Sequence, residues 1–87
     1  EIHFQEIKAV CELVEIGLLY GLYTGLYKNG ITDETLWETA DDITRNAIGI
    51  VEAFSGNRFT DAQYYMLEGI VHDRAYKYLE RHGVTIC

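Results

Sequence analysis

Hydrophobic residues recur at spacings of three and four in three segments of the chain, which are separated by clusters of turn-forming residues at 28–30 and 55–57. That spacing places apolar side chains on one face of an α-helix. Thr32 and Thr60 precede the second and third segments, where a threonine hydroxyl can cap the first turn of a helix. We therefore predict helices at about 3–28, 33–54 and 61–82.

The second and third segments each have one apolar stripe. In the second segment it comprises Leu36, Ala40, Ile43, Ala47, Ile50 and Phe54. In the third it comprises Tyr64, Leu67, Val71, Ala75, Tyr78 and Leu79. Proline, which is common in the turns of loop-rich and β-sandwich domains, is absent from the chain. We expect residues 1–87 to form a single all-α domain, an antiparallel (up-down-up) three-helix bundle, either alone or doubled into a six-helix homodimer.

The first segment changes character halfway along. Its first half has a polar side at Lys8, Glu12 and Glu15. At about 100° per residue, Leu19, Tyr23 and Leu26 come close to that same side, so the second half is apolar all round. Two partner helices cover only part of it, and a contiguous exposed apolar set usually marks an interface. We predict a protein interface formed by Leu19, Tyr23, Leu26 and Tyr27. The alternative is that residues 84–87 fold back over this face.

Three glycines, Gly17, Gly21 and Gly25, follow one another at a spacing of four in the first segment. Interior glycines cost helix stability, about 1 kcal/mol each relative to alanine. A ridge without side chains lets another helix approach closely. We predict close packing at Gly21 against Ala40 and Ala75. The same ridge could instead be a homodimer seam, or the helix could kink or end early near Gly21 or Gly25.

The charge of the chain bears on its partners. There are 14 acidic and 7 basic side chains, giving a net charge of −7. That balance opposes direct binding to nucleic acid and to anionic membranes, and it favours a basic protein partner. The second segment begins with an acidic docking face that comprises Asp33, Glu34, Glu38, Asp41 and Asp42. This face is either ordinary solvated surface or a surface that imitates a nucleic-acid backbone.

Catalytic and metal-binding patterns are missing from the sequence. Glu68 and His72 are four residues apart, whereas helical di-metal sites use a spacing of three with carboxylates from other helices. Cys11 lies in an apolar pattern next to Glu12, which favours a buried, unreactive thiol. We predict no catalytic residue, no cofactor and no metal.

Two features bear on where the protein works. The cysteines suggest free thiols in a reducing compartment, and no secretion signal is visible. The longest run without charge, Ile16–Tyr27, has 12 residues, whereas a membrane-spanning helix needs about 20. We expect a cytoplasmic protein.

These observations favour a small acidic non-enzymatic protein-binding module, which acts as a regulator or inhibitor by docking onto another macromolecule. By analogy, phages and mobile elements use small acidic proteins in this way. The first alternative is a structural homodimeric subunit. A more distant one is a nucleic-acid mimic that inhibits a DNA- or RNA-binding protein.

Overall fold

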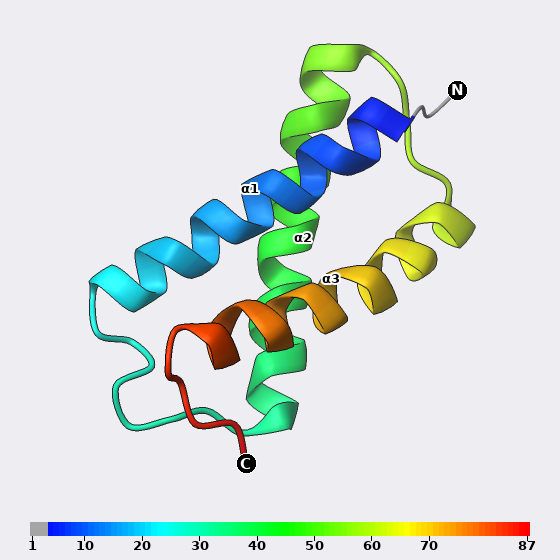
Figure 1. Ribbon diagram of the computed structural model, residues 1–87. Coiled ribbons are helices and arrows are strands. Elements are labelled where there is room, and N and C mark those ends of the chain that lie inside the picture. The colour runs from blue at the N-terminus through cyan, green and yellow to red at the C-terminus, as the bar shows by residue number, and fades with distance from the viewer. Residues whose placement is uncertain (1–3) are drawn as a thin grey trace.

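The computed structural model describes residues 4–87, which form three helices and no strand. Helix α1 spans Phe4–Tyr23, α2 spans Asp33–Ser55 and α3 spans Asp61–Arg81. Every pair of these helices is in contact. In Figure 1, α1 and α3 cross the same face of α2, and the connection between α2 and α3 passes the start of α1. The predicted all-helical fold of three packed helices is confirmed; residue 3, the predicted start of the first helix, lies outside the described residues.

The two later helices begin where the sequence predicts, because both threonine caps form. The hydroxyl of Thr32 accepts the backbone N–H of Thr35 at 3.1 Å. Thr60 accepts the N–H of Gln63 at 3.1 Å, and the Gln63 side chain accepts the N–H of Thr60 at 2.8 Å. This reciprocal capping box satisfies N–H groups that would otherwise lack a partner at the start of α3. Helix α2 ends at Gly56, whose φ of 76° is the left-handed conformation that glycine adopts most easily.

The core contains part of each predicted stripe, but on α2 the predicted members Ile50 and Phe54 are exposed, whereas Ile48 and Val51 are buried. Its buried members on the helices are Val10, Cys11, Val14, Leu18, Leu36, Ala40, Ala47, Ile48, Val51, Leu67, Val71, Ala75 and Leu79. One polar side chain, Thr44, is also fully buried. Its hydroxyl donates to the carbonyl oxygen of Ala40 at 2.6 Å, which avoids the cost of an unpaired buried group.

Helix α1 ends at Tyr23 rather than near residue 28, so the predicted C-terminal boundary is wrong. The cause is Gly25, which has a φ of +77°. The N–H of Leu26 reaches back to the carbonyl oxygen of Gly21 at 2.9 Å, which closes the last turn. The alternative of an early helix end at these glycines is confirmed.

The early end brings Tyr27 back onto α1. A Cβ placed on Gly21 would lie only 2.6 Å from Cε2 of Tyr27, so Gly21 makes room for this ring. Tyr27 is therefore 5% exposed, and its predicted place in an exposed interface is wrong. The packing of Gly21 against Ala40 and Ala75 stays a prediction. Gly17 is the glycine that faces a neighbouring helix, because its Cβ would lie 2.9 Å from Cγ2 of Ile43.

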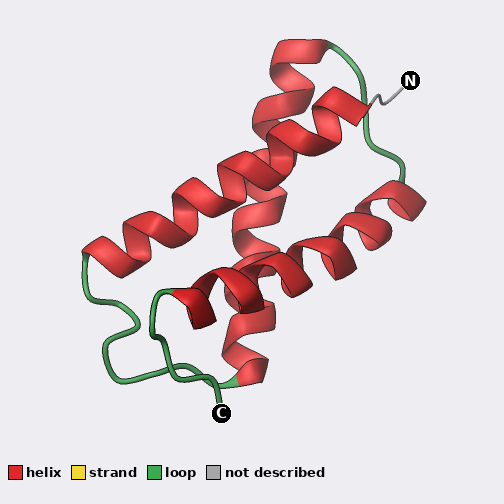
Figure 2. Cartoon of the chain, in the orientation of Figure 1, coloured by secondary structure: helices red, strands yellow, loops and turns green. Residues whose placement is uncertain are grey.

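The C-terminal segment runs beside the start of α2. The N–H of Ile31 donates to Thr85, the N–H of Cys87 donates to Ile31, and the N–H of Asp33 donates to Cys87, at 2.9 to 3.0 Å. Figure 2 shows this segment next to the loop that joins α1 to α2. Because Leu19 and Tyr23 stay exposed, the alternative in which the C-terminal residues cover them is wrong.

Within residues 4–87, none of the helices combines the length and the apolar character needed to cross a membrane.

Candidate functional site

The outer side of α1 carries a contiguous set of exposed apolar side chains, which we call the α1 apolar face: Ile16, Leu19, Tyr20 and Tyr23. At about 100° per residue, these four side chains fall within an arc of about 100° on the helix. Leu19 is 52% exposed and Tyr23 is 89% exposed. The sequence predicted Leu19 and Tyr23 as surface residues but missed Ile16 and Tyr20, although both lie on the same stripe.

The other two predicted interface residues, Leu26 and Tyr27, differ in exposure. Leu26 lies in the loop after α1 and is 67% exposed, whereas Tyr27 is buried against Gly21. Successive side chains of an irregular loop point in directions that helical spacing does not give. The predicted set of four is therefore divided, with three members at the surface.

The α1 apolar face continues into a groove of about 490 Å³ between α1 and α2, which we call the α1–α2 groove. Its lining residues are Gln5, Glu6, Ala9, Glu12, Leu13, Ile16, Ile50, Val51, Phe54 and Ser55. Ile16 belongs to both surfaces. Phe54 stands at the edge of the groove and is 90% exposed, an unusual state for a large apolar side chain.

The size of the side chains explains where the two helices meet most closely. Gly17 lets Ile43 of α2 approach α1. Ile50 and Phe54 lie farther along the same stripe of α2, and both are exposed although the stripe predicts a core position. Ala9, whose side chain is small, is one of the α1 residues that line the groove. The sequence contained the stripe, but which end of it stays open depends on how the helices cross.

Two carboxylates, Glu6 and Glu12, line the groove, and among the described residues of its lining there is no basic side chain. Oε1 of Glu6 accepts a hydrogen bond from Nδ2 of Asn57 at 3.1 Å. Its Oε2 is buried and has no hydrogen-bond partner among residues 4–87. Glu12 meets Lys8 at 4.0 Å, and since both side chains are largely exposed this contact contributes little. The groove is therefore apolar with a negative edge.

The acidic docking face predicted on α2 is partly engaged within the chain. Asp33 lies 3.1 Å from Nε2 of His72, and Asp41 accepts hydrogen bonds from Tyr64 and Arg45. The remaining members, Glu34, Glu38 and Asp42, are exposed and form no ion pair with another described residue. The docking role of this face, including imitation of a nucleic acid, stays a prediction.

The contacts of Asp41 set several protonation states. Burial raises the pKa of the Asp41 carboxyl, but the hydrogen bonds from Tyr64 and Arg45 outweigh burial and hold that pKa below its ordinary value. Burial and the bond to Asp41 raise the pKa of Tyr64 to about 12. Burial, followed by the nearby Asp41 carboxylate, raises the pKa of Glu68. This cluster joins α2 to α3 and holds a neutral phenol against a charged carboxylate.

Glu68 and His72, the pair considered for metal binding, have separate partners. The His72 ring stacks on Trp37, with ring centres 3.7 Å apart and planes 8° from parallel, and it also contacts Asp33. Over residues 4–87, no group of three or more histidine, cysteine or acidic side chains could hold a metal ion.

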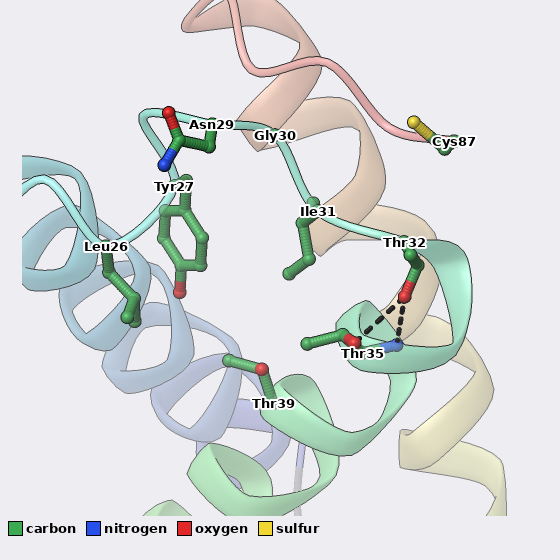
Figure 3. Close-up of a pocket in the computed structure, with 9 residues that line it drawn as sticks. All are labelled: Leu26, Tyr27, Asn29, Gly30, Ile31, Thr32, Thr35, Thr39 and Cys87. Carbon is green, nitrogen blue, oxygen red and sulfur yellow. Dashed lines mark hydrogen bonds between the residues drawn. The ribbon is translucent and has the colours of Figure 1, made fainter.

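A second pocket, of about 350 Å³, lies where the loop after α1 meets the first turns of α2. Figure 3 shows Leu26, Tyr27 and Thr39 gathered at one end of it and Cys87 standing apart at the other. The hydroxyl of Thr32 is occupied by its cap bonds to Thr35. Burial raises the pKa of the Tyr27 phenol. No acid or base of this lining stands beside the exposed Cys87 thiol to activate it.

The other cysteine, Cys11, is buried in the core as predicted. Burial raises the pKa of its thiol, and Glu15 and Glu12 act in the same direction against the opposing effect of Arg74. A thiol held in the protonated form is a poor nucleophile and a poor metal ligand.

Comparison of the chain with protein-family models, with curated proteins and with solved structures found no match.

Proposed function

We propose that the protein is a small non-enzymatic binding module, which regulates or inhibits another protein by docking onto it through the α1 apolar face. The observation that carries this proposal is the exposure of Leu19, Tyr20 and Tyr23 side by side on one helix. Single exposed apolar residues are ordinary, whereas a contiguous group is typical of an interaction surface. Tyrosine suits such a surface because it combines an apolar ring with a polar tip.

The test is a double substitution, Leu19→Glu with Tyr23→Glu, which places two charges in the centre of the face. Both side chains are exposed, so we expect the helix content by circular dichroism to be unchanged. The tagged protein and the variant are compared by affinity purification from the native cells with quantitative mass spectrometry. Proteins that bind through the face should be depleted at least tenfold with the variant, since one buried charge costs several times RT.

Tyr65→Glu is the matched control, because Tyr65 is an exposed tyrosine on α3 outside the α1 apolar face. It should retain every partner. If the double variant retains the same proteins as the unmodified chain, the α1 apolar face is not the docking surface.

A second candidate function is a structural homodimer in which two up-down-up bundles join into six helices. It is favoured by the exposure of both Leu19 and Leu26, which a second copy would cover. Salt distinguishes the two candidates. Docking on a basic partner should weaken as the salt concentration rises, whereas an apolar seam between two copies should not.

A further inference from the structure

The α1–α2 groove has the form of a site for one helix. Its walls come from two helices, with Leu13 and Ile16 on one side and Ile50 and Phe54 on the other. A helix that lies in such a groove inserts apolar side chains spaced three and four residues apart. The exposure of Phe54 at the edge leaves a large ring available to close over the occupant. The shape and the apolar walls point to an amphipathic helix.

The charges of the groove select the kind of helix. Its lining contains Glu6 and Glu12 without a basic residue, and the whole chain has a net charge of −7. By contrast, the groove between α1 and α3 mixes Lys8 and Arg74 with acidic residues, so it has no single sign. Within the described part of the chain, the α1–α2 groove combines apolar walls with acidic side chains on its edge.

A second copy of the chain fits this groove poorly. In a symmetric dimer formed through this groove, both copies would bring Glu6 and Glu12 to the interface, and the described lining offers them no basic partner. Like charges across an interface suppress association. A basic helix instead gains from the same carboxylates.

We propose that the α1–α2 groove binds an amphipathic helix of another protein, with apolar side chains against Ile16, Ile50 and Phe54 and with basic residues beside Glu6 and Glu12. This inference rests on the proposed docking function, and it specifies the partner segment as a basic amphipathic helix. The α1 apolar face extends the groove past Ile16 along the same stripe, so a long helix could contact both.

The test uses two labelled helical peptides of about five turns, roughly 18 residues each. Both carry leucine at spacings of three and four, with lysine beside the leucine stripe in one and glutamate in the other. Binding to the full chain is measured by fluorescence anisotropy over a range of salt concentrations. The lysine peptide should bind at least tenfold more tightly than the glutamate peptide, and its affinity should fall as salt screens the charges.

Two variants assign the binding to the groove. Phe54→Ser removes an exposed ring and Glu12→Gln removes one edge charge, so neither should unfold the chain. Phe54→Ser should lower the affinity for the lysine peptide at least tenfold. Glu12→Gln should lower this affinity less and should reduce its dependence on salt. Tyr65→Ser, which removes an exposed ring outside the groove, should leave binding unchanged.

Three results would overturn the proposal. They are equal or absent binding of both peptides, binding that survives Phe54→Ser, and self-association in analytical ultracentrifugation that Phe54→Ser abolishes. The last would assign the groove to a second copy. None of them decides the proposed function, because that depends on the effect of Leu19→Glu with Tyr23→Glu on bound proteins. If the groove binds neither peptide but the double variant still loses its bound proteins, docking is confined to the α1 apolar face.

Discussion

The helical glycines of this chain differ in what surrounds them. A Cβ on Gly21 would lie 2.6 to 2.8 Å from two ring carbons and the hydroxyl oxygen of Tyr27, and one on Gly17 would lie 2.9 Å from Cγ2 of Ile43. A Cβ on Gly49 or Gly69 would meet nothing within 4 Å. The sequence indicates close packing at Gly21, but it cannot show that the neighbour is a ring from the following loop. The room available around Gly21 depends on how the loop after α1 folds back, which helical periodicity does not describe.

Gly21→Ala should therefore destabilise the protein although alanine favours helices. Overpacking of a filled site typically costs 1–3 kcal/mol, against a gain of about 1 kcal/mol in helix propensity. Because the ring of Tyr27 is buried, it has little room to move. We expect a net loss of about 1 kcal/mol in the free energy of unfolding, measured with urea. Gly49→Ala and Gly69→Ala are the controls and should each gain up to about 1 kcal/mol. An equal gain for Gly21→Ala would show that Tyr27 moves freely.

The Tyr64 hydroxyl gives a second prediction at this scale, on alkaline stability. Its pKa rises from 10.0 to about 12 in the folded protein. The neutral phenol is thus favoured by folding, so its contribution is complete below pH 10 and is lost as the pH rises from 10 through about 12. In urea unfolding, Tyr64→Phe should make the fall in stability over this range shallower.

The matched control for that experiment is Tyr65→Phe, which removes a neighbouring, exposed hydroxyl that makes no hydrogen bond within the described part of the chain. The stability of Tyr65→Phe should fall with rising pH as steeply as that of the unmodified protein. Tyr27, whose pKa burial also raises, is present in every variant and leaves the comparison unaffected. Identical curves for Tyr64→Phe and the unmodified chain would exclude the bond to Asp41 as a source of the alkaline loss.

Among the elements, the starts of the two capped helices were predictable, whereas the end of α1 was foreseen only as an alternative to a longer helix. Thr32 and Thr60 fix the starts of α2 and α3 by local hydrogen bonds, which depend only on neighbouring residues. After Tyr23 the apolar pattern continues through Leu26 and Tyr27, so periodicity alone extends the helix. The backbone stops at Gly25 because glycine enters the left-handed region at low cost.

Gly25→Ala tests this account of how α1 ends. The left-handed conformation costs a non-glycine residue about 1–2 kcal/mol, and no side chain nearby offers compensation because the space around Gly25 is open. We expect a loss of about that size in the free energy of unfolding. Gly49→Ala, at an open helical position without positive φ, again serves as the control. A gain in both variants would mean that α1 continues past Tyr23 in solution.

For the whole molecule, the exposed half of the candidate site was predictable and the groove was not. The exposure of Leu19 and Tyr23 was predictable, because two partner helices cannot cover α1 on all sides. The groove depends on the crossing of α1 and α2, which places Ile50 and Phe54 outside the core although their stripe also contains the buried Ala47. Crossing geometry arises from packing of the whole chain, so no local pattern contains it.

The final prediction concerns assembly, the property that separates the two candidate functions. Covering a leucine contributes roughly 1.5–3 kcal/mol, and a two-fold seam would cover Leu19 and Leu26 of both copies. Association entropy opposes this with an estimated 4–15 kcal/mol, so Tyr23 must join the contact. Repulsion between two chains of −7 is weakened at physiological salt, where the screening length is about 8 Å.

Under the homodimer hypothesis, analytical ultracentrifugation should show a dimer at micromolar concentration, insensitive to added salt. Leu19→Glu with Leu26→Glu should give a folded monomer, while Tyr65→Glu, on an exposed site of α3, should remain dimeric. A monomer for the unmodified chain at high concentration would contradict the homodimer. Because the C-terminal residues bond to the start of α2 and leave Leu19 exposed, the α1 apolar face would then be open to a different protein.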